Sequence, residues 1–343
     1  MITVRKEGKI LEKTHHQFEN QGVLNPAVIK EGENVHLYYR AVGQGGRSTI
    51  GYCRLKGPTK VVERWDRPIM VPEIEFESFG MEDPRIVKID NLYFLSYTGF
   101  DGINARAALA ISQDLYHFKK VGILAPPITY ADFVSGTKTD VNISGRYFSN
   151  QTSYLQETAP GKPLMLWDKD VVFFPKRIKA QLVFLHRIRP GIQIVKIDSL
   201  KQLTKEFWDD YFLHLEEHVI MEPLFDHESS YIGSGCPPIE TPYGWLLIYH
   251  GADETDNGIV YSACAAALLD LENPAKIVSR LPYALFKPEY EWEKQGEVNN
   301  VVFPTGTALF GDTLYIYYGA AGEQIAVASI SLPELLNELV IQW

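Results

Sequence analysis

A five-fold internal repeat is the feature of this 343-residue chain that most restricts its fold. Each copy starts near a proline, passes through a turn and continues into an alternating apolar and aromatic run. Such alternation predicts β-strands. Repeats that cannot bury a face alone must stack on one another, and units of this size are typical of propeller blades. The five marking prolines, at spacings of 58, 91, 63 and 66 residues, are Pro26, Pro84, Pro175, Pro238 and Pro304.

The repeat predicts an all-β fold, a five-bladed β-propeller with short peripheral helices, formed by a single domain over residues 1–343. Nineteen Tyr, seventeen Phe and six Trp also favour strands. The alternative is a β-sandwich whose hairpins resemble one another by chance. Apolar residues at intervals of three and four predict a helix within 199–219, and a second helix is expected at the C-terminal end with Ser331 as its N-cap.

The second spacing is longer than the others by about 30 residues, which predicts an insertion at about 128–166. Long loops within a domain often serve as lids or interfaces. A passive surface excursion explains the segment equally well, so both interpretations stay open.

Charge and composition exclude several classes of function. The net charge of −10 is spread along the chain without a basic patch, which argues against a nucleic-acid partner. No apolar stretch approaches the ~20 residues of a membrane span, and the first residues lack a secretory signal. The three cysteines are too scattered for a disulfide framework or a zinc site, so no metal is expected and the cytoplasm is the expected location.

Polar residues occur at equivalent strand positions of different repeats. In a propeller these positions converge on the central channel, where carboxylates beside basic groups suit a sugar and an anion. Taken one at a time, each residue is more simply explained by a structural ion pair, because an unpaired charge among apolar neighbours is costly. The set consists of Asn25, Arg40, Asp83, Arg85, Lys169, Asp170, Arg187, Glu240 and His250.

Seven segments along the chain carry a resemblance to a known family. In order they are MEDPRIVKIDNLYFLSYTGFD, ARAALAISQDLYHFKKVGILAPP, KDVVFFPKRI, LHRI, YIGSGCPPIETPYGWLLIYHGAD, AALLDLENPAKIV and VNNVVFPTGTAL. Together they resemble the mannoside phosphorylases and mannosidases of glycoside hydrolase family 130. The resemblance implies a five-bladed propeller that acts on β-mannoside oligosaccharides with inversion of configuration.

The resemblance also implies roles for individual residues. Asp83 is the expected general acid, acting through a hydroxyl of the bound mannose. Asn25 and Arg40 match positions that hold the mannose ring. Glu240, from the polar set above and not from the resemblance, is also expected to bind substrate. The expected phosphate site, for inorganic phosphate as co-substrate and with no other cofactor, comprises Lys169, Arg187, His250 and Tyr231.

Departures from the family pattern leave two reactions open. Tyr231 stands where the phosphorylases carry a Lys, and Gly322 stands where they usually carry an Asp. Glu228 lies three residues before Tyr231 and is the candidate base if water is the nucleophile, since an inverting hydrolase needs a base as well as an acid.

The leading hypothesis is an inverting β-mannoside phosphorylase that releases α-mannose 1-phosphate. The alternatives are an inverting β-mannosidase of the same family and a non-catalytic glycan-binding propeller, because fold alone does not fix function. The glycosidic linkage, the leaving sugar and whether the chain forms a homo-oligomer stay open.

Overall fold

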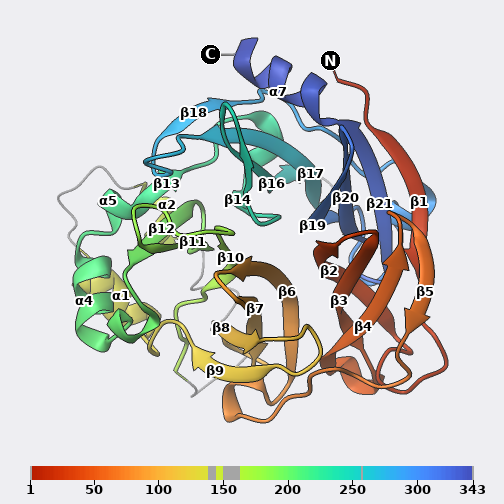
Figure 1. Cartoon of the computed structure of the whole chain (residues 1–343). Coiled ribbons are helices and arrows are strands. Elements are labelled where there is room, and N and C mark those ends of the chain that lie inside the picture. Colours follow the sequence, from red (N-terminus) through yellow and green to blue (C-terminus); the bar gives the residue numbers. More distant parts are fainter. Residues whose placement is uncertain (1, 138–143, 150–162, 256–257, 342–343) are drawn as a thin grey trace.

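The computed structural model describes residues 2–137, 144–149, 163–255 and 258–341. Within these ranges the chain is mostly β, built from antiparallel strands in four hydrogen-bonded sheets, none of which closes on itself. Figure 1 shows β2, β6, β10, β14 and β19 around the middle of the molecule, with β1, β5, β9 and β18 at the rim.

The largest sheet consists of two antiparallel units. One residue pair, Ser48 with Gly80, is the parallel bridge that joins them. The first unit comprises β2 (Gly22–Glu31), β3 (Asn34–Val42), β4 (Ser48–Lys56) and β5 (Lys60–Arg64). The second comprises β6 (Gly80–Ile89), β7 (Leu92–Phe100), β8 (Ala105–Ser112) and β9 (Lys119–Ile123).

Two further sheets follow along the chain. One contains β10 (Lys169–Phe173), β11 (Leu182–Arg187), β12 (Ile192–Ile197) and β13 (Val219–Met221). The other contains β14 (Tyr231–Ser234), β15 (Ile239–Thr241), β16 (Gly244–Thr255), β17 (Gly258–Leu269) and β18 (Ile277–Arg280).

The last sheet unites the two ends of the chain. The N-terminal strand pairs with the last strand, where Arg5 lies opposite Ser329. Its members are β1 (Arg5–Leu11), β19 (Val302–Phe310), β20 (Thr313–Ala320) and β21 (Gln324–Ser331).

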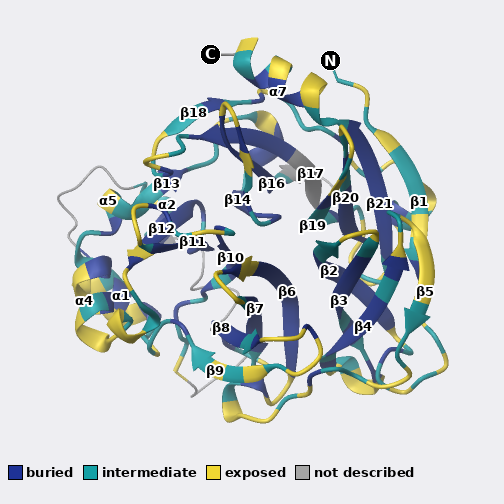
Figure 2. Ribbon diagram, viewed as in Figure 1, coloured by how far each residue is buried: buried dark blue, intermediate teal, exposed yellow. Residues whose placement is uncertain are grey.

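The hydrophobic core is divided among the spaces between neighbouring sheets. Strand β16 shows why, because Trp245 and Leu247 pack toward β11 and β12 while Leu246 and Ile248 pack toward β20 and β21. The middle strands are therefore buried on both faces, as Figure 2 shows, and their apolar runs are nearly continuous.

The expected helices are present. The segment 199–219 contains α4 (Lys205–Leu213) and α5 (Leu215–His218), and Thr204 caps α4 by accepting from the Phe207 N–H. Helix α7 (Leu332–Ile341) follows β21, and the Ser331 hydroxyl accepts from the Glu334 N–H, which confirms the predicted cap. A short helix, α6 (Glu291–Lys294), precedes β19.

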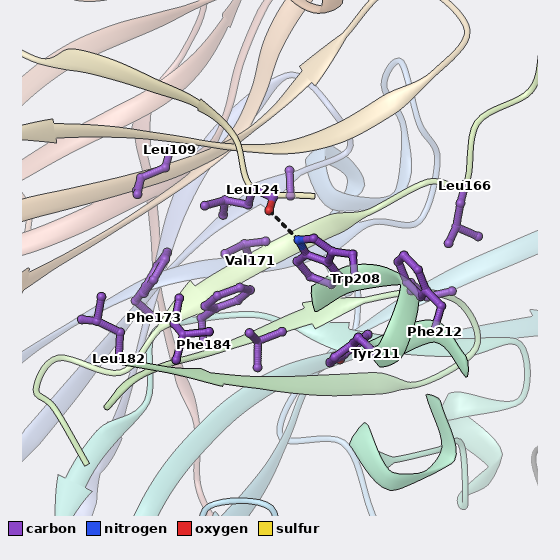
Figure 3. Packing of buried hydrophobic residues seen from close by; sticks show 14 of the residues in the cluster. Leu109, Leu124, Leu166, Val171, Phe173, Leu182, Phe184, Trp208, Tyr211 and Phe212 are labelled. Carbon is purple, nitrogen blue, oxygen red and sulfur yellow. Dashed lines mark hydrogen bonds between the residues drawn. The ribbon is translucent and has the colours of Figure 1, made fainter. Parts of the chain in front are cut away.

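The described parts of the expected insertion join the core. They contain α1 (Tyr130–Gly136) and α2 (Arg146–Ser149), and they bury Tyr130, Phe133 and Tyr147 beside α4. Figure 3 shows this cluster, in which the Trp208 indole donates a 2.9 Å hydrogen bond to the Leu124 carbonyl. The remainder of the insertion lies outside the described residues.

A buried glutamate recurs beside the middle strand of four antiparallel units. In each case the carboxylate accepts a hydrogen bond from a tyrosine hydroxyl of that strand and pairs with a basic side chain nearer the rim. The four clusters are Glu19–Tyr39–Arg64, Glu77–Tyr97–Lys120, Glu228–Tyr249–Arg280 and Glu293–Tyr318–Lys6.

Candidate active site

A pocket of about 260 Å³ lies where β2, β6 and β10 begin. Its polar lining contains seven of the residues expected from the sequence to form the site, which come from segments as much as 206 positions apart. They are Asn25, Arg40, Asp83, Lys169, Asp170, Arg187 and Tyr231.

Local backbone geometry turns three of the side chains toward the pocket. Asn25, Asp83 and Asp170 have φ of +50°, +47° and +56°, and each lies at a register shift in the first strand of its unit. Asn and Asp are among the few non-glycine residues that tolerate this conformation. Strain of this kind tends to persist where function requires it.

Asp83 is buried within a network of polar groups. The Asn25 amide donates to its carboxylate at 2.6 Å, and the Lys169 amine lies 3.8 Å and the Arg40 guanidinium 4.0 Å from its oxygens. Burial acts to raise the pKa of Asp83, but Lys169, Arg40 and Arg85 together outweigh it and hold the pKa at about 2. The unliganded carboxyl is therefore ionised at neutral pH.

Glu82 is a site residue that was not expected from the sequence. Its carboxylate lies 2.7 Å from Arg40 and 3.1 Å from Lys169, so it orients both cations beside Asp83. Because the bulge at Asp83 interrupts strand alternation, consecutive carboxylates reach the same region. In the sequence, the glutamate directly before Asp83 in MEDPR was the feature that could have indicated that Glu82 belongs to the site.

Asp170 forms the second buried carboxylate of the pocket wall. It lies 3.0 Å from Arg187 and 3.6 Å from the His250 ring nitrogen. Burial acts to raise the pKa of Asp170, and Arg187, His250 and Arg85 lower it further than burial raises it. Arg85 is fully buried behind the wall, where its guanidinium donates to the Gly235 and Asp83 carbonyls, and this role is structural.

His250 lies beneath the pocket surface rather than on it. Its side chain is buried, and its ring centroid lies 4.3 Å from that of Phe303, which lines the pocket. Burial lowers the pKa of His250 to about 3, against the opposing effect of Asp170. The imidazole is therefore neutral at neutral pH and adds no charge to the site.

Besides the buried Arg85 and His250, two further expected residues, Glu228 and Glu240, lie outside the pocket. Glu240 is exposed on β15, where it pairs with Lys176 at 2.6 Å, and it borders a different hollow lined by the far ends of β2 and β6. Glu228 is fully buried and accepts hydrogen bonds from Tyr249, Arg280 and the Leu224 N–H. Both are left out of the proposed site, because Glu240 points elsewhere and Glu228 is one of the four recurring structural glutamates.

Several lining residues were not among the site residues expected from the sequence. Trp167 presents an indole whose N–H donates to the Ile103 carbonyl, and Arg189 extends from the turn after β11. Gly322, at φ +74°, lines the pocket where the family pattern has a carboxylate, while Glu323 pairs with Lys13. The remaining lining residues are Leu24, Val298, Val301 and Phe303.

The charge of the pocket is opposite to that of the chain. Among the described residues, four cations, Arg40, Lys169, Arg187 and Arg189, line it with two carboxylates, Asp83 and Asp170, and Glu82 adds a third beside Arg40 and Lys169, while the whole chain carries −10. Such a pocket suits an anion next to a neutral polar molecule.

Among the described residues, no group of three or more His, Cys, Asp or Glu side chains is placed to hold a metal ion. None of the helices in the described ranges has the length and apolar character needed to cross a membrane.

The fold and pocket thus define a mostly β protein in which buried carboxylates and a cluster of cations meet where the inner strands begin. Residues 5–340 match the family Glyco_hydro_130, described as beta-1,4-mannooligosaccharide phosphorylase. The chain therefore belongs to glycoside hydrolase family 130.

Three similar proteins illustrate this relationship. The 1,2-beta-oligomannan phosphorylase of Thermoanaerobacter sp. (strain X514) is 34% identical over 95% of both chains. The beta-1,2-mannobiose phosphorylase of the same strain is 34% identical over 92% of both chains. The structure of beta-1,2-mannobiose phosphorylase from Listeria innocua in complex with beta-1,2-mannobiose has a TM-score of 0.72 at 21% identity and covers 99% of this chain and 100% of its own.

Proposed function

We propose that this chain is an inverting phosphorylase of β-mannosides, which uses inorganic phosphate to release α-mannose 1-phosphate and a shortened sugar. The observation that carries this proposal is the pocket itself, in which an acid, Asp83, adjoins a cluster of four cations on an acidic chain. The two relatives at 34% identity are named as phosphorylases. Their names refer to β-1,2-linked substrates, and we propose the same linkage here.

The residues divide into two groups by chemistry. Asn25 and Arg40, which contact Asp83, and Trp167, which lines the same pocket, are the proposed sugar-binding side, since they offer hydrogen bonds and an aromatic face. Lys169 and Arg187 are proposed to hold phosphate through charge-assisted hydrogen bonds. A phosphate oxygen attacks the anomeric carbon as the bond to the glycosidic oxygen breaks, and that oxygen takes a proton derived from Asp83, through a mannose hydroxyl as the family resemblance implies.

Because the pKa of Asp83 is low in the unliganded pocket, bound phosphate is proposed to help Asp83 acquire the proton that it later donates. An ionised carboxylate has no proton to give, and Lys169 is the foremost of the cations that keep it ionised. A phosphate dianion next to Lys169 offsets this cation, so its arrival raises the pKa of Asp83. The acid is then protonated most readily when both substrates are bound.

Hydrolysis is the second candidate function, and Tyr231 is the observation that favours it, because a neutral phenol replaces a cation at the anion site. An inverting hydrolase also needs a carboxylate base. Among described residues, the carboxylates at the site besides Asp83 are Asp170 and Glu82, and Asp170 is paired with Arg187 while Glu82 is paired with Arg40 and Lys169. Glu228 is engaged by Arg280 and Tyr249, which weakens this candidate.

For the architecture, we propose one five-bladed propeller domain over residues 1–343, in which the eight-stranded sheet counts as two blades. Hydrophobic clusters between successive units, the pairing of β1 with β21 and the four recurring glutamate clusters support it. We place the enzyme in the cytoplasm, where a sugar phosphate retains the energy of the cleaved bond for metabolism.

The test is the initial rate on β-1,2-mannobiose with and without inorganic phosphate. We expect turnover only with phosphate and almost none in Asp83→Asn. Equal rates with and without phosphate would show that the protein is a hydrolase and not a phosphorylase. Binding of mannobiose without turnover in either condition would favour a glycan-binding protein.

A further inference from the structure

The cations of the pocket differ in how far their charge is already compensated. Arg40 and Lys169 share Glu82 at 2.7 and 3.1 Å, and Arg187 pairs with Asp170 at 3.0 Å. For Arg189, by contrast, no carboxylate of the described part of the chain lies within ion-pair distance. Within the described part of the chain, Arg189 is therefore the pocket cation whose charge is least compensated.

Arg189 is held over an aromatic ring. Its guanidinium carbon lies 3.8 Å from the centroid of the Tyr231 ring, and that of Arg187 lies 4.9 Å from the same centroid. A guanidinium over an aromatic face gains cation–π stabilisation while its N–H groups remain directed outward from its edge. Tyr231 thus acts as a platform that brings two arginines together at the pocket wall.

The turn that carries Arg189 is built from several directions. The Gln193 side chain accepts from the Ile188 N–H at 2.6 Å and donates to the Ile188 carbonyl at 3.0 Å. The Ile232 N–H, next to Tyr231, donates to the Pro190 carbonyl at 2.9 Å. These bonds tie the backbone on both sides of Arg189 to β12 and β14.

The insertion contributes to the same turn. Gln193 also donates to the buried Tyr147 hydroxyl at 3.0 Å, and Arg146 donates to the carbonyls of Ser229 and Ser230, immediately before Tyr231. The segment expected to be either a lid or a passive excursion therefore braces both the arginine and its aromatic platform.

We propose that Arg189 is a phosphate-binding and specificity-determining residue, which supplies the cationic contact that Tyr231 and the buried His250 do not. This proposal rests on the proposed phosphorylase function. Phosphate is doubly charged near neutral pH, and Lys169 and Arg187 are already shared with carboxylates, so an uncompensated guanidinium determines whether the pocket favours the anion over water. Its planar fork suits two phosphate oxygens.

The test compares Arg189→Ala with Arg177→Ala, a matched control in which a partly exposed arginine of the β10–β11 connection loses its pairing with Asp90. We expect Arg189→Ala to raise the KM for phosphate and the calorimetric Kd for inorganic phosphate about 10- to 100-fold, which corresponds to about 1.4–2.8 kcal/mol. The KM for β-1,2-mannobiose should change less than about twofold, and Arg177→Ala should match the wild type. Adding Tyr231→Lys to Arg189→Ala should recover about tenfold in phosphate affinity.

Each result has a distinct meaning. An unchanged phosphate Kd in Arg189→Ala, or equal increases in both KM values, would overturn the role of Arg189 even if the wild type requires phosphate. If the turnover rate of the wild type does not depend on phosphate, the proposed phosphorylase function is wrong. If the Kd for phosphate is nevertheless weakened in Arg189→Ala, Arg189 still belongs to an anion-binding site. Arg189→Gln keeps the length and polarity of the side chain and provides the same test should the alanine variant be unstable.

Discussion

The side-chain amide of Asn25 donates a 2.6 Å hydrogen bond to the carboxylate of Asp83, although the two residues are 58 positions apart. Each occupies the same bulged position, at positive φ, in the first strand of its own unit. The contact shows how the repeat creates a site, because equivalent positions of neighbouring units converge where the inner strands begin.

Replacement of Asp83 by Asn should lower kcat on β-1,2-mannobiose with phosphate by about 10²–10⁴-fold, the usual contribution of a general acid. A mannoside whose leaving group needs no protonation, such as a dinitrophenyl mannoside, should lose much less. Asp90→Asn, at an exposed carboxylate paired with Arg177, is the control and should retain full activity. A uniform loss on both substrates would instead point to misplaced binding groups.

Gly319 holds the Asn25–Asp83 pair in place by its lack of a side chain. A Cβ at this position would lie 2.0 Å from the Asn25 side-chain oxygen and 2.9 Å from its backbone nitrogen. Gly319→Ala should therefore displace Asn25 and reduce kcat/KM for the mannoside at least about tenfold. Gly136→Ala, where a Cβ would meet nothing within 4 Å, should leave kcat/KM unchanged. Wild-type activity in Gly319→Ala would show that the Asn25 contact is dispensable.

Glu228 should matter for stability rather than for chemistry. Glu228→Gln weakens a fully buried network with Arg280 and Tyr249, and Glu77→Gln weakens the corresponding network with Lys120 and Tyr97. We expect each variant to lose about 1–3 kcal/mol of unfolding free energy and to keep kcat at temperatures where it is folded. Loss of turnover in Glu228→Gln alone, with unchanged stability, would identify Glu228 as a base.

His250 should make the protein less stable at mildly acidic pH. Its pKa is lowered by burial to about 3 in the folded chain, against about 6.5 when unfolded, so the unfolded state binds the proton first. The stability that comes from the neutral ring is complete above pH ~6.5 and decreases as the pH falls below that value toward about 3. Denaturant unfolding of wild type and His250→Gln from pH 4 to 8 should give a shallower slope for the variant. Identical slopes of unfolding free energy against pH in the two proteins would show that another group causes the pH dependence.

Much of the site could be read from the repeat. Asn25, Arg40, Asp83, Lys169, Asp170 and Arg187 belong to the polar set at equivalent strand positions, and the structure gathers them in one pocket, whereas Tyr231 was indicated only by the family resemblance. Arg189 lies in a turn, where the sequence has no periodicity that predicts the direction of a side chain. The direction of the Arg189 side chain depends on tertiary contacts, such as the hydrogen bond from the Ile232 N–H to the Pro190 carbonyl.

The two glutamates left out of the site have different explanations. Glu228 belongs to a second repeat, a glutamate followed after about 20 residues by a strand tyrosine, which also occurs at Glu19 and Glu77. That pattern was present in the sequence and indicates a structural role. Glu240 lies on the three-residue strand β15, near the ends of β2 and β6 that are far from the pocket. The position of Glu240 in the sequence does not show at which end of these strands it lies.

The most direct test of the central claim is the identity and configuration of the first product. Wild-type protein is incubated with β-1,2-mannobiose and inorganic phosphate, and ³¹P and ¹H NMR spectra are recorded before the anomers equilibrate. The proposed chemistry predicts α-mannose 1-phosphate and one equivalent of free mannose, with no turnover when phosphate is omitted. Two equivalents of free mannose with no sugar phosphate, at a rate independent of phosphate, would contradict it.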